Sequence, residues 1–437
     1  MKLALGVVEK TLRGNKTRRE GDAMRIATKQ QCKGLVSYAG TALLALSLAG
    51  TVAESRVTNE APARAADNSQ GDVKTRTACF TAHVPGDPVP ISVTGTLYFH
   101  RHYTTTDPVL LLLHGLASNR GVWDGGGAGD ESPRFARLLA DRGYVVIAID
   151  RPGYGDSPYP NANVLTVGNA ILMEHEIVGE IRSGSYTVAR AGDDDETPPR
   201  CPAGDQAAFG SPTVVLIGHS SGGGQAQNYT TRFHDISATV AIGSHGATGG
   251  QAHTIVDILN RVVGPQINAG SQFPIFFGPG PMGVSTDCLS LLFYQPGAEP
   301  EVYNAICSNE AVATYTAPVR EYVGPPVIPS THDGVIAHQV GATPVLLVFP
   351  EQDAVVPGPG NPFGDPDLRT KEIDFWNNNC ACDFTSLVLP NTGHDAKFHL
   401  SAPTLVDEID SWLTSRGLGP GRVHNYTDDG SGDQDLH

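Results

Sequence analysis

Short, mostly apolar segments recur along the middle and the C-terminal half of the chain. Each is five or six residues long, most are rich in valine, isoleucine or leucine, and all are bounded by glycine, proline or polar residues. Segments of this length and composition are typical of strands buried on both faces, as in a parallel sheet. Six segments show the pattern: 109–113, 144–149, 213–217, 238–242, 344–349 and 384–389.

Further elements fit around these segments. Two strands, 80–84 and 91–99, are predicted before the first of them, and helices are predicted at 131–142 and 225–233. Strands that alternate with helices along a chain indicate an α/β protein with a parallel sheet.

Two insertions interrupt the alternation. Residues 183–211 contain the acidic run 193–196 and are predicted to be a solvated excursion. Residues 245–343 separate two strands and contain aromatic and leucine side chains among many prolines and glycines. We interpret this second insertion as a cap or lid of irregular loops, in which a few apolar side chains shape a substrate pocket.

The segment 213–217 leads into Gly218-His219-Ser220-Ser221-Gly222, a G-x-S-x-G sequence followed by a predicted helix. A strand, a sharp turn and a helix form the context of a nucleophile elbow, in which the serine has strained backbone geometry. The residues two before and two after the serine must be small, and both are glycine. Ser220 is therefore the predicted nucleophile.

A serine hydroxyl needs a base and an acid that orients the base. Asp353 follows the segment 344–349 and precedes an apolar pair and a proline, which makes it our choice for the acid. Glu351 lies in the same turn and is the alternative. His394 follows the segment 384–389 in the same way and is the predicted base.

The oxyanion of a tetrahedral intermediate needs two backbone N–H donors. One is predicted to be the N–H of Ser221, beside the nucleophile. The other is predicted to be the N–H of Leu116, in the loop that follows the segment 109–113. Glycine in this loop allows the backbone to approach a substrate closely. The predicted substrate-binding residues are His114, Gly115 and His219.

These motifs resemble those of the α/β-hydrolase superfamily. They are Leu-Leu-Leu-His-Gly-Leu (111–116), Asp-Arg-Pro-Gly-Tyr-Gly-Asp-Ser (150–157), the elbow, Glu-Gln-Asp (351–353) and Gly-His (393–394), within roughly residues 78–416. The resemblance implies a mostly parallel eight-stranded sheet with helices on both faces and a Ser-Asp-His triad at strand ends. The serine at the elbow differs from the aspartate that epoxide hydrolases and haloalkane dehalogenases use. The Gly-Gly-Ser-Tyr-Gly elbow of secreted aminopeptidases is also missing.

The chemistry that these residues support is hydrolysis of a small or lipid-like ester through an acyl-enzyme, which requires no metal ion or organic cofactor. An amidase or peptidase with the same triad is one alternative, and a hydrolase-like fold retained for binding is another. The net charge of −16 and the lack of a basic stripe argue against nucleic acid as a partner.

Residues 1–53 have the pattern of a secretory signal peptide. Nine lysines and arginines lie among the first 33 residues, and the uncharged run 34–50 is followed by small residues. Either Met1 or Met24 could be the start. The alternative is that 34–53 is retained as a membrane anchor, because the run approaches the ~20 residues that a bilayer needs. We expect cleavage and secretion, with membrane contact only if the segment is retained.

Six cysteines follow the predicted signal peptide, and an even set of this size suits up to three disulfides in an oxidising compartment. A bridge between Cys288 and Cys307 is favoured, but the connectivity is open. The six are Cys79, Cys201, Cys288, Cys307, Cys380 and Cys382. The predicted organisation is a signal peptide (1–53), a linker (54–77), a hydrolase domain (78–420, with the cap at 245–343) and an acidic disordered tail (421–437).

Overall fold

The structure is a computed structural model that describes part of the chain. The described residues are 73–83, 87–100, 103, 106–115, 118–127, 134–157, 167–189, 205–206, 210–244, 297–298, 342–353, 370, 373–374, 376–377 and 383–421. All of them belong to one compact unit, Ala65–His437. The predicted signal peptide, most of the linker, nearly all of the 245–343 insertion and the tail beyond residue 421 lie outside the described residues.

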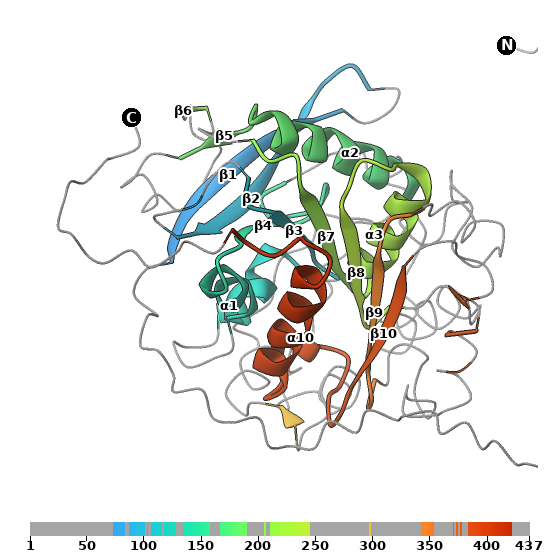
Figure 1. Cartoon of the computed structure of the whole chain (residues 1–437). Coiled ribbons are helices and arrows are strands. Elements are labelled where there is room, and N and C mark those ends of the chain that lie inside the picture. Colours follow the sequence, from blue (N-terminus) through green and yellow to red (C-terminus); the bar gives the residue numbers. More distant parts are fainter. Residues whose placement is uncertain are drawn as a thin grey trace, which may run out of the picture. The chain divides into compact units, whose positions relative to one another are not determined.

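The described strands form one sheet in the order β10-β9-β8-β7-β3-β4-β2-β1-β5-β6 (Figure 1). Their bounds are β1 Lys74–Ala82, β2 Ile91–Phe99, β3 Val109–Leu113, β4 Val145–Ile149, β5 Thr187–Val188, β6 Asp205–Gln206, β7 Val214–His219, β8 Ala238–Ile242, β9 Val345–Pro350 and β10 Phe384–Leu389. The helices are η1 Arg120–Gly127, α1 Phe135–Asp141, α2 Val167–Ser183, α3 Ser221–Arg232, η7 Ala396–Phe398 and α10 Ala402–Thr414.

The six apolar segments form the parallel part of the sheet. Neighbouring strands from β10 through β9, β8, β7 and β3 to β4 are parallel, whereas β2 pairs with β4, and β1 with β2, in antiparallel register. The eight longer strands make the mostly parallel sheet of the α/β-hydrolase fold, as predicted. The two-residue strands β5 and β6 extend it antiparallel beyond β1.

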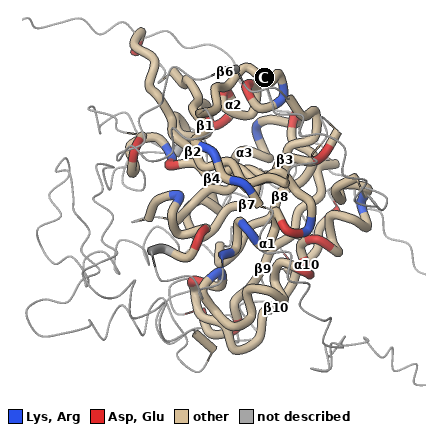
Figure 2. Tube along the Cα trace, turned by 90° about the vertical axis from the view of Figure 1, so that its left-hand side faces the viewer, with Lys and Arg blue, Asp and Glu red and all other residues tan. Residues whose placement is uncertain are grey.

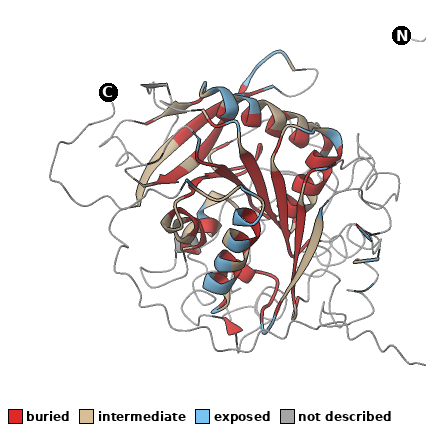
Figure 3. Cartoon of the chain, in the orientation of Figure 1, coloured by how far each residue is buried: buried red, intermediate tan, exposed pale blue. Residues whose placement is uncertain are grey.

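Helices cover both faces of the sheet (Figure 1). Side chains along β3 point alternately to the two faces of the sheet, so this strand contributes to two cores. Leu111 and Leu113 pack in a core with residues of α2 and α3, whereas Leu110 and Leu112 pack with residues of α1 and α10. Figure 3 shows that the central strands are buried on both faces. Burial on both faces explains why these strands are continuous apolar runs rather than alternating ones.

Several elements differ from the sequence prediction. The strand β1 begins at Lys74, inside the predicted linker, and the helix α2 was not predicted. The helix after the elbow begins at Ser221 rather than at 225. The first insertion contributes β5 and β6 to the edge of the sheet, while its acidic run 193–196, predicted to be solvated, lies outside the described residues.

Acidic and basic residues are spread over the elements of the described chain (Figure 2). Among the described residues, no helix is long and apolar enough to cross a membrane.

Candidate active site

The nucleophile elbow lies between β7, which ends at His219, and α3, which begins at Ser221. Ser220 has φ 54° and ψ −120°, a left-handed backbone conformation that is uncommon for a residue with a side chain. Its N–H donates to the carbonyl of Ile242 at 2.9 Å, and its own carbonyl accepts the N–H of Gly224 at 3.0 Å. The Ser220 side chain makes no capping hydrogen bond to α3. The strained serine is therefore held by its backbone, and its hydroxyl is not used to cap the helix.

The two glycines of the elbow are required by close backbone approach. A Cβ on Gly218 would overlap the carbonyl oxygen of Gly222, and a Cβ on Gly222 would overlap the carbonyl oxygen of Leu113. The elbow thus packs against itself and against the end of β3. This is the physical reason for small residues on both sides of Ser220.

Asp353 and His394 form a buried pair. Asp353 Oδ2 lies 2.9 Å from His394 Nδ1, and the side chains are 0% and 4% exposed. A carboxylate only accepts, so Nδ1 carries the proton, and the lone pair of Nε2 is the one that can act as a base. Glu351 is used differently, because its Oε2 accepts the backbone N–H of Asn391 at 2.9 Å. The geometry therefore favours Asp353 over Glu351 as the partner of the histidine.

The parallel sheet brings these residues to one edge. Gly115, Ser220, Asp353 and His394 follow the carboxyl ends of β3, β7, β9 and β10, which is where ligands bind in open α/β sheets. The turn of Asp353 is joined to the loop of His394 by a hydrogen bond from the N–H of Gln352 to Thr392, at 2.9 Å. A Cβ on Gly115 would lie 3.2 Å from Ser220 Cβ, so this glycine borders the nucleophile. Leu116 lies outside the described residues.

His219 joins the elbow to the loop of the predicted base. Its Nε2 donates to the carbonyl of His394 at 2.9 Å, and its Nδ1 accepts from Lys397 Nζ at 3.2 Å. Burial and the charge of Lys397 hold the pKa of His219 well below its usual value, so the ring is neutral. Lys397 also forms an ion pair with Asp395, and the ammonium group lies over the Trp123 ring.

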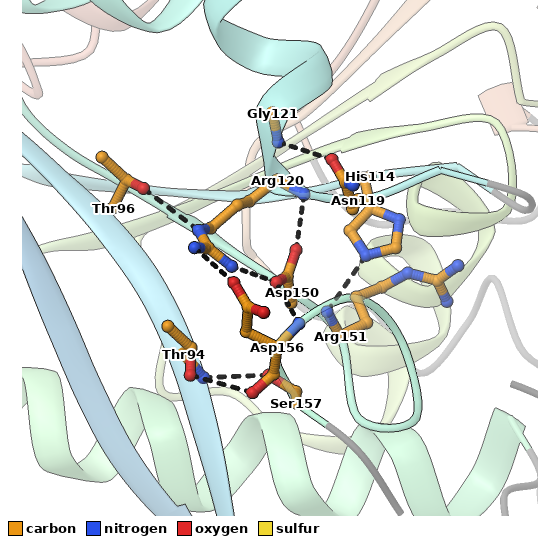
Figure 4. A network of polar contacts seen from close by, with 10 residues as sticks. All are labelled: Thr94, Thr96, His114, Asn119, Arg120, Gly121, Asp150, Arg151, Asp156 and Ser157. Carbon is orange, nitrogen blue, oxygen red and sulfur yellow. Dashed lines mark hydrogen bonds and ion pairs between the residues drawn. The ribbon is translucent and has the colours of Figure 1, made fainter. Parts of the chain in front are cut away.

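His114 and Arg151 hold the start of the loop that follows β3 (Figure 4). His114 Nδ1 donates to the carbonyl of Gly115 at 2.8 Å, and Nε2 accepts the N–H of Arg151 at 3.0 Å. Burial, followed by the charge of Arg151, holds the pKa of His114 well below its usual value. The buried Arg151 side chain donates from Nη2 to the Gly115 carbonyl at 3.1 Å and to Ser221 Oγ at 3.0 Å. One guanidinium thus contacts the two segments that flank the nucleophile.

The glycine-rich loop 150–157 is fixed by a second arginine (Figure 4). Arg120 pairs with Asp150 and with Asp156, the latter at 2.8 Å, and its Nε donates to Thr96 Oγ1 at 3.2 Å. These contacts give the acids of the loop a structural role.

The contacts of the two predicted substrate-binding histidines favour a supporting role. Both rings are buried, and both ring nitrogens of His114 and of His219 bind groups of the protein.

The sequence analysis assigned no role to Arg151, Lys397 or His399. Arg151 lies inside the quoted motif 150–157, and a charged residue within a glycine-rich loop was the available signal. Lys397 and His399 lie close to His394 in the chain, but their contacts with His219 and with backbone groups carried no sequence signal.

Within the described part of the chain, no group of three or more His, Cys, Asp or Glu side chains is arranged to hold a metal ion. Cys79 is the one cysteine among the described residues, and it is disulfide-bonded. The other five predicted disulfide cysteines lie outside those residues.

A parallel sheet with a nucleophile elbow at its carboxyl edge is the architecture of α/β hydrolases. A family model described as "Alpha/beta hydrolase family" matches residues 110–409, and the chain belongs to this family. The family assignment supports a hydrolase. Among curated protein sequences, none matches this chain.

Several solved structures align with most of this chain at low sequence identity. A membrane phospholipase A, described as a novel bacterial virulence factor, is 17% identical with a TM-score of 0.50, and the alignment covers 79% of this chain and 87% of that one. A thermophilic esterase from Thermogutta terrifontis is 16% identical, with a TM-score of 0.48 and coverage of 78% and 99%. A highly thermostable carboxyl esterase from Bacillus coagulans is 14% identical, with a TM-score of 0.48 and coverage of 78% and 98%.

Proposed function

We propose that the protein hydrolyses carboxylic esters with Ser220 as the nucleophile, His394 as the general base and Asp353 as the orienting acid. The observation that carries the proposal is the buried hydrogen bond of 2.9 Å between Asp353 and His394, at the edge of the sheet where the strained Ser220 lies. A hydrolase fold alone would not favour this chemistry, but an oriented imidazole at the same sheet edge as an elbow serine does.

The proposed reaction is acyl transfer to water. Ser220 Oγ attacks the ester carbonyl while His394 Nε2 takes its proton, and the imidazolium then protonates the leaving alkoxide. Water, deprotonated by the same nitrogen, attacks the acyl-enzyme, the bond to Ser220 Oγ breaks, and the imidazolium returns its proton to Oγ as the acid leaves. Asp353 keeps the proton on Nδ1 and stabilises the imidazolium, so all proton transfers use Nε2.

The proposed oxyanion donors are the backbone N–H groups of Ser221 and Leu116. Two contacts support this part of the proposal. Ser221 Oγ and the Gly115 carbonyl are both bound by Arg151, and Gly115 borders Ser220. These contacts hold Gly115 and Ser221 in place before a substrate binds.

We also propose that the protein is exported. The basic segment followed by the uncharged run 34–50 supports a signal peptide, and the bonded state of Cys79 supports an oxidising compartment. The proposed partners are a small or lipid-like ester and no nucleic acid, with membrane contact only if residues 34–53 are retained.

A fluorophosphonate probe tests the nucleophile. We expect one adduct by intact mass, mapped to Ser220, no adduct in Ser220→Ala and an adduct that still maps to Ser220 in the neighbouring Ser221→Ala. Turnover of Ser220→Ala should fall by at least about 10³-fold with folding unchanged. A folded wild-type protein that takes no adduct at Ser220 would overturn the proposal.

A second measurement separates esterase from amidase activity. Matched p-nitrophenyl esters and p-nitroanilides of increasing acyl length differ only in the scissile bond. We expect turnover of the esters and little turnover of the anilides. Equal rates on both series would favour the amidase alternative.

A further inference from the structure

We propose that His399 is a positioning residue for the catalytic base, His394. The side chain of His399 holds the loop of His394 from both sides, and its backbone joins that loop to the 245–343 insertion. The proposal rests on the proposed function, in which His394 removes the proton from Ser220. His399 takes no part in the proton transfers of that mechanism.

The ring of His399 spans the loop that carries His394. Its Nε2 accepts the backbone N–H of Gly393 at 2.9 Å, and its Nδ1 donates to the carbonyl of Asp395 at 3.0 Å. These two groups belong to the residues immediately before and after His394. The residue is 0% exposed, so water does not compete for either hydrogen bond. One side chain therefore fixes the backbone on both sides of the base.

This arrangement requires a neutral imidazole, because Nε2 must accept while Nδ1 donates. Burial lowers the pKa of His399 to about 4, even though the carbonyl and carboxylate of Asp395 raise it. The charge of Lys397 lowers the pKa further, and that of Asp353 raises it. The ring is therefore neutral at any pH at which a histidine of ordinary pKa can act as a base.

Two described residues of the insertion contact the same loop. Ala298 forms an antiparallel bridge with His399, and the N–H of Leu400 donates to the carbonyl of Gly297 at 2.8 Å. A Cβ on Gly297 would overlap the carbonyl oxygen of Asn391, which also lies in this loop. The backbone of Gly297 and Ala298 is therefore seated between the two ends of the segment that carries His394.

The consequence is a mechanical connection between the insertion and the base. A general base must be held close to the geometry in which it reacts, and a misplacement of about 1 Å can lower turnover about 100-fold. Displacement of Gly297 or loss of the His399 hydrogen bonds would move the backbone of His394 without any change in the triad side chains.

Two variants of His399 test this role. His399→Leu removes both hydrogen bonds, whereas His399→Gln can still accept the N–H of Gly393 near the position of Nε2. We expect kcat to fall between about 10- and 100-fold in His399→Leu with KM within about twofold of wild type, and to recover largely in His399→Gln. The NMR signal of the proton between Asp353 and His394 should shift or broaden in His399→Leu and return toward the wild-type signal in His399→Gln. The control is His83→Leu, which removes a surface histidine whose side chain is 53% exposed.

Gly297→Ala tests the connection without altering His399. The added methyl group cannot fit against Asn391, so the insertion must move away from the loop, and we expect kcat to fall while the fluorophosphonate still labels Ser220. If His399→Leu does not fold, the single variants Gly297→Ala and His399→Gln test the positioning role instead.

The outcomes separate this proposal from the proposed function. A wild-type protein that is not labelled at Ser220 contradicts the proposed function itself. Normal labelling of the wild type, with unchanged kcat in folded His399 variants and in Gly297→Ala, contradicts only the positioning role. A loss that lies wholly in KM also contradicts it, because a misplaced base lowers kcat.

Discussion

His219, the residue before the elbow serine, donates a hydrogen bond of 2.9 Å to the carbonyl of His394, 175 residues further along the chain. The same ring accepts a hydrogen bond from Lys397, which is itself paired with Asp395. The strand that ends in the nucleophile and the loop that carries the base are therefore connected through buried polar groups. Such groups hold a site firmly while they are satisfied, and each becomes costly when its partner is removed.

Removal of Lys397 should destabilise the protein strongly. Lys397→Met leaves the Asp395 carboxylate buried without its cation, and breaking a buried ion pair in this way typically costs about 3–5 kcal/mol. Urea denaturation measures the loss. The double variant Lys397→Met/Asp395→Asn should recover much of it, because no uncompensated charge is left.

The matched control is the exposed pair between Arg142 and Asp407, in which the aspartate is 61% exposed. Arg142→Met should cost no more than about 1 kcal/mol. If Lys397→Met and Arg142→Met lower the free energy of unfolding equally, burial of the ion pair between Lys397 and Asp395 does not increase the cost of breaking it.

Buried neutral histidines predict a loss of stability in mild acid. The pKa values of His114 and His219 are held well below the usual value near 6.5, chiefly by burial, so the unfolded chain binds protons that the folded chain does not. Their contribution is fully present above pH 6.5 and is lost as the pH falls from there toward the folded pKa values. Denaturation at pH 8, 6.5 and 5 should show a decline only below about pH 6.5. A free energy of unfolding that is the same at pH 8 and pH 5 would contradict the buried neutral state.

Much of the fold could be predicted from the sequence because the central strands are buried on both faces. The strands β2, β3, β8 and β10 have the predicted bounds. The helix α2 was missed although Ile171, Ile177, Val178 and Ile181 are buried at roughly helical spacing. A buried acid, Glu174, and several polar residues interrupt this apolar face, which weakens the periodicity on which a prediction depends.

The candidate site could be predicted only in part. Ser220 and His394 follow strands and carry local motifs, so their positions could be predicted. Asp353 was preferred to Glu351 for its place after the strand, but the contacts that distinguish the two acids of this turn are visible only in the structure. Arg151, Lys397 and His399 were assigned no role, because their roles arise from contacts between elements or with backbone groups that the local sequence does not specify.

The acid of the proposed triad can be tested by two matched substitutions. Asp353→Asn should lower kcat by about 10⁴-fold, since an amide favours the wrong tautomer of His394. Glu351→Gln should be mild, because a glutamine oxygen can still accept the N–H of Asn391. If Glu351→Gln lowers kcat strongly and Asp353→Asn is mild, the orienting acid is Glu351 rather than Asp353.

Arg151 should matter for turnover more than for substrate affinity. Arg151→Met removes the hydrogen bonds to the Gly115 carbonyl and to Ser221 Oγ, and we expect kcat to fall about 10- to 100-fold with little change in KM. The double variant Arg151→Met/Ser221→Ala should lose less than the sum of the single variants, because both remove the same contact.

Two further variants control this prediction. Arg137→Met removes an arginine that pairs with Asp124 away from these segments, and it should leave kcat unchanged. Arg151→Lys retains the charge and one donor group if the methionine variant does not fold. If the losses in kcat from Arg151→Met and Ser221→Ala add up in the double variant, the two side chains do not act through the hydrogen bond between them.

The last prediction concerns the disulfides and the compartment. The bonded state of Cys79 fits the prediction of three bridges among six cysteines, each of which stabilises by about 2–4 kcal/mol. Non-reducing mass spectrometry of the secreted protein should find no thiol open to alkylation, and reduction should lower the Tm clearly. Cys79→Ser should release one new thiol, and its alkylation would identify the partner of Cys79. The mature chain should begin near residue 54. Six thiols that alkylate without reduction would contradict the bridges, and an intact segment 34–53 in a membrane fraction would instead favour the anchored form.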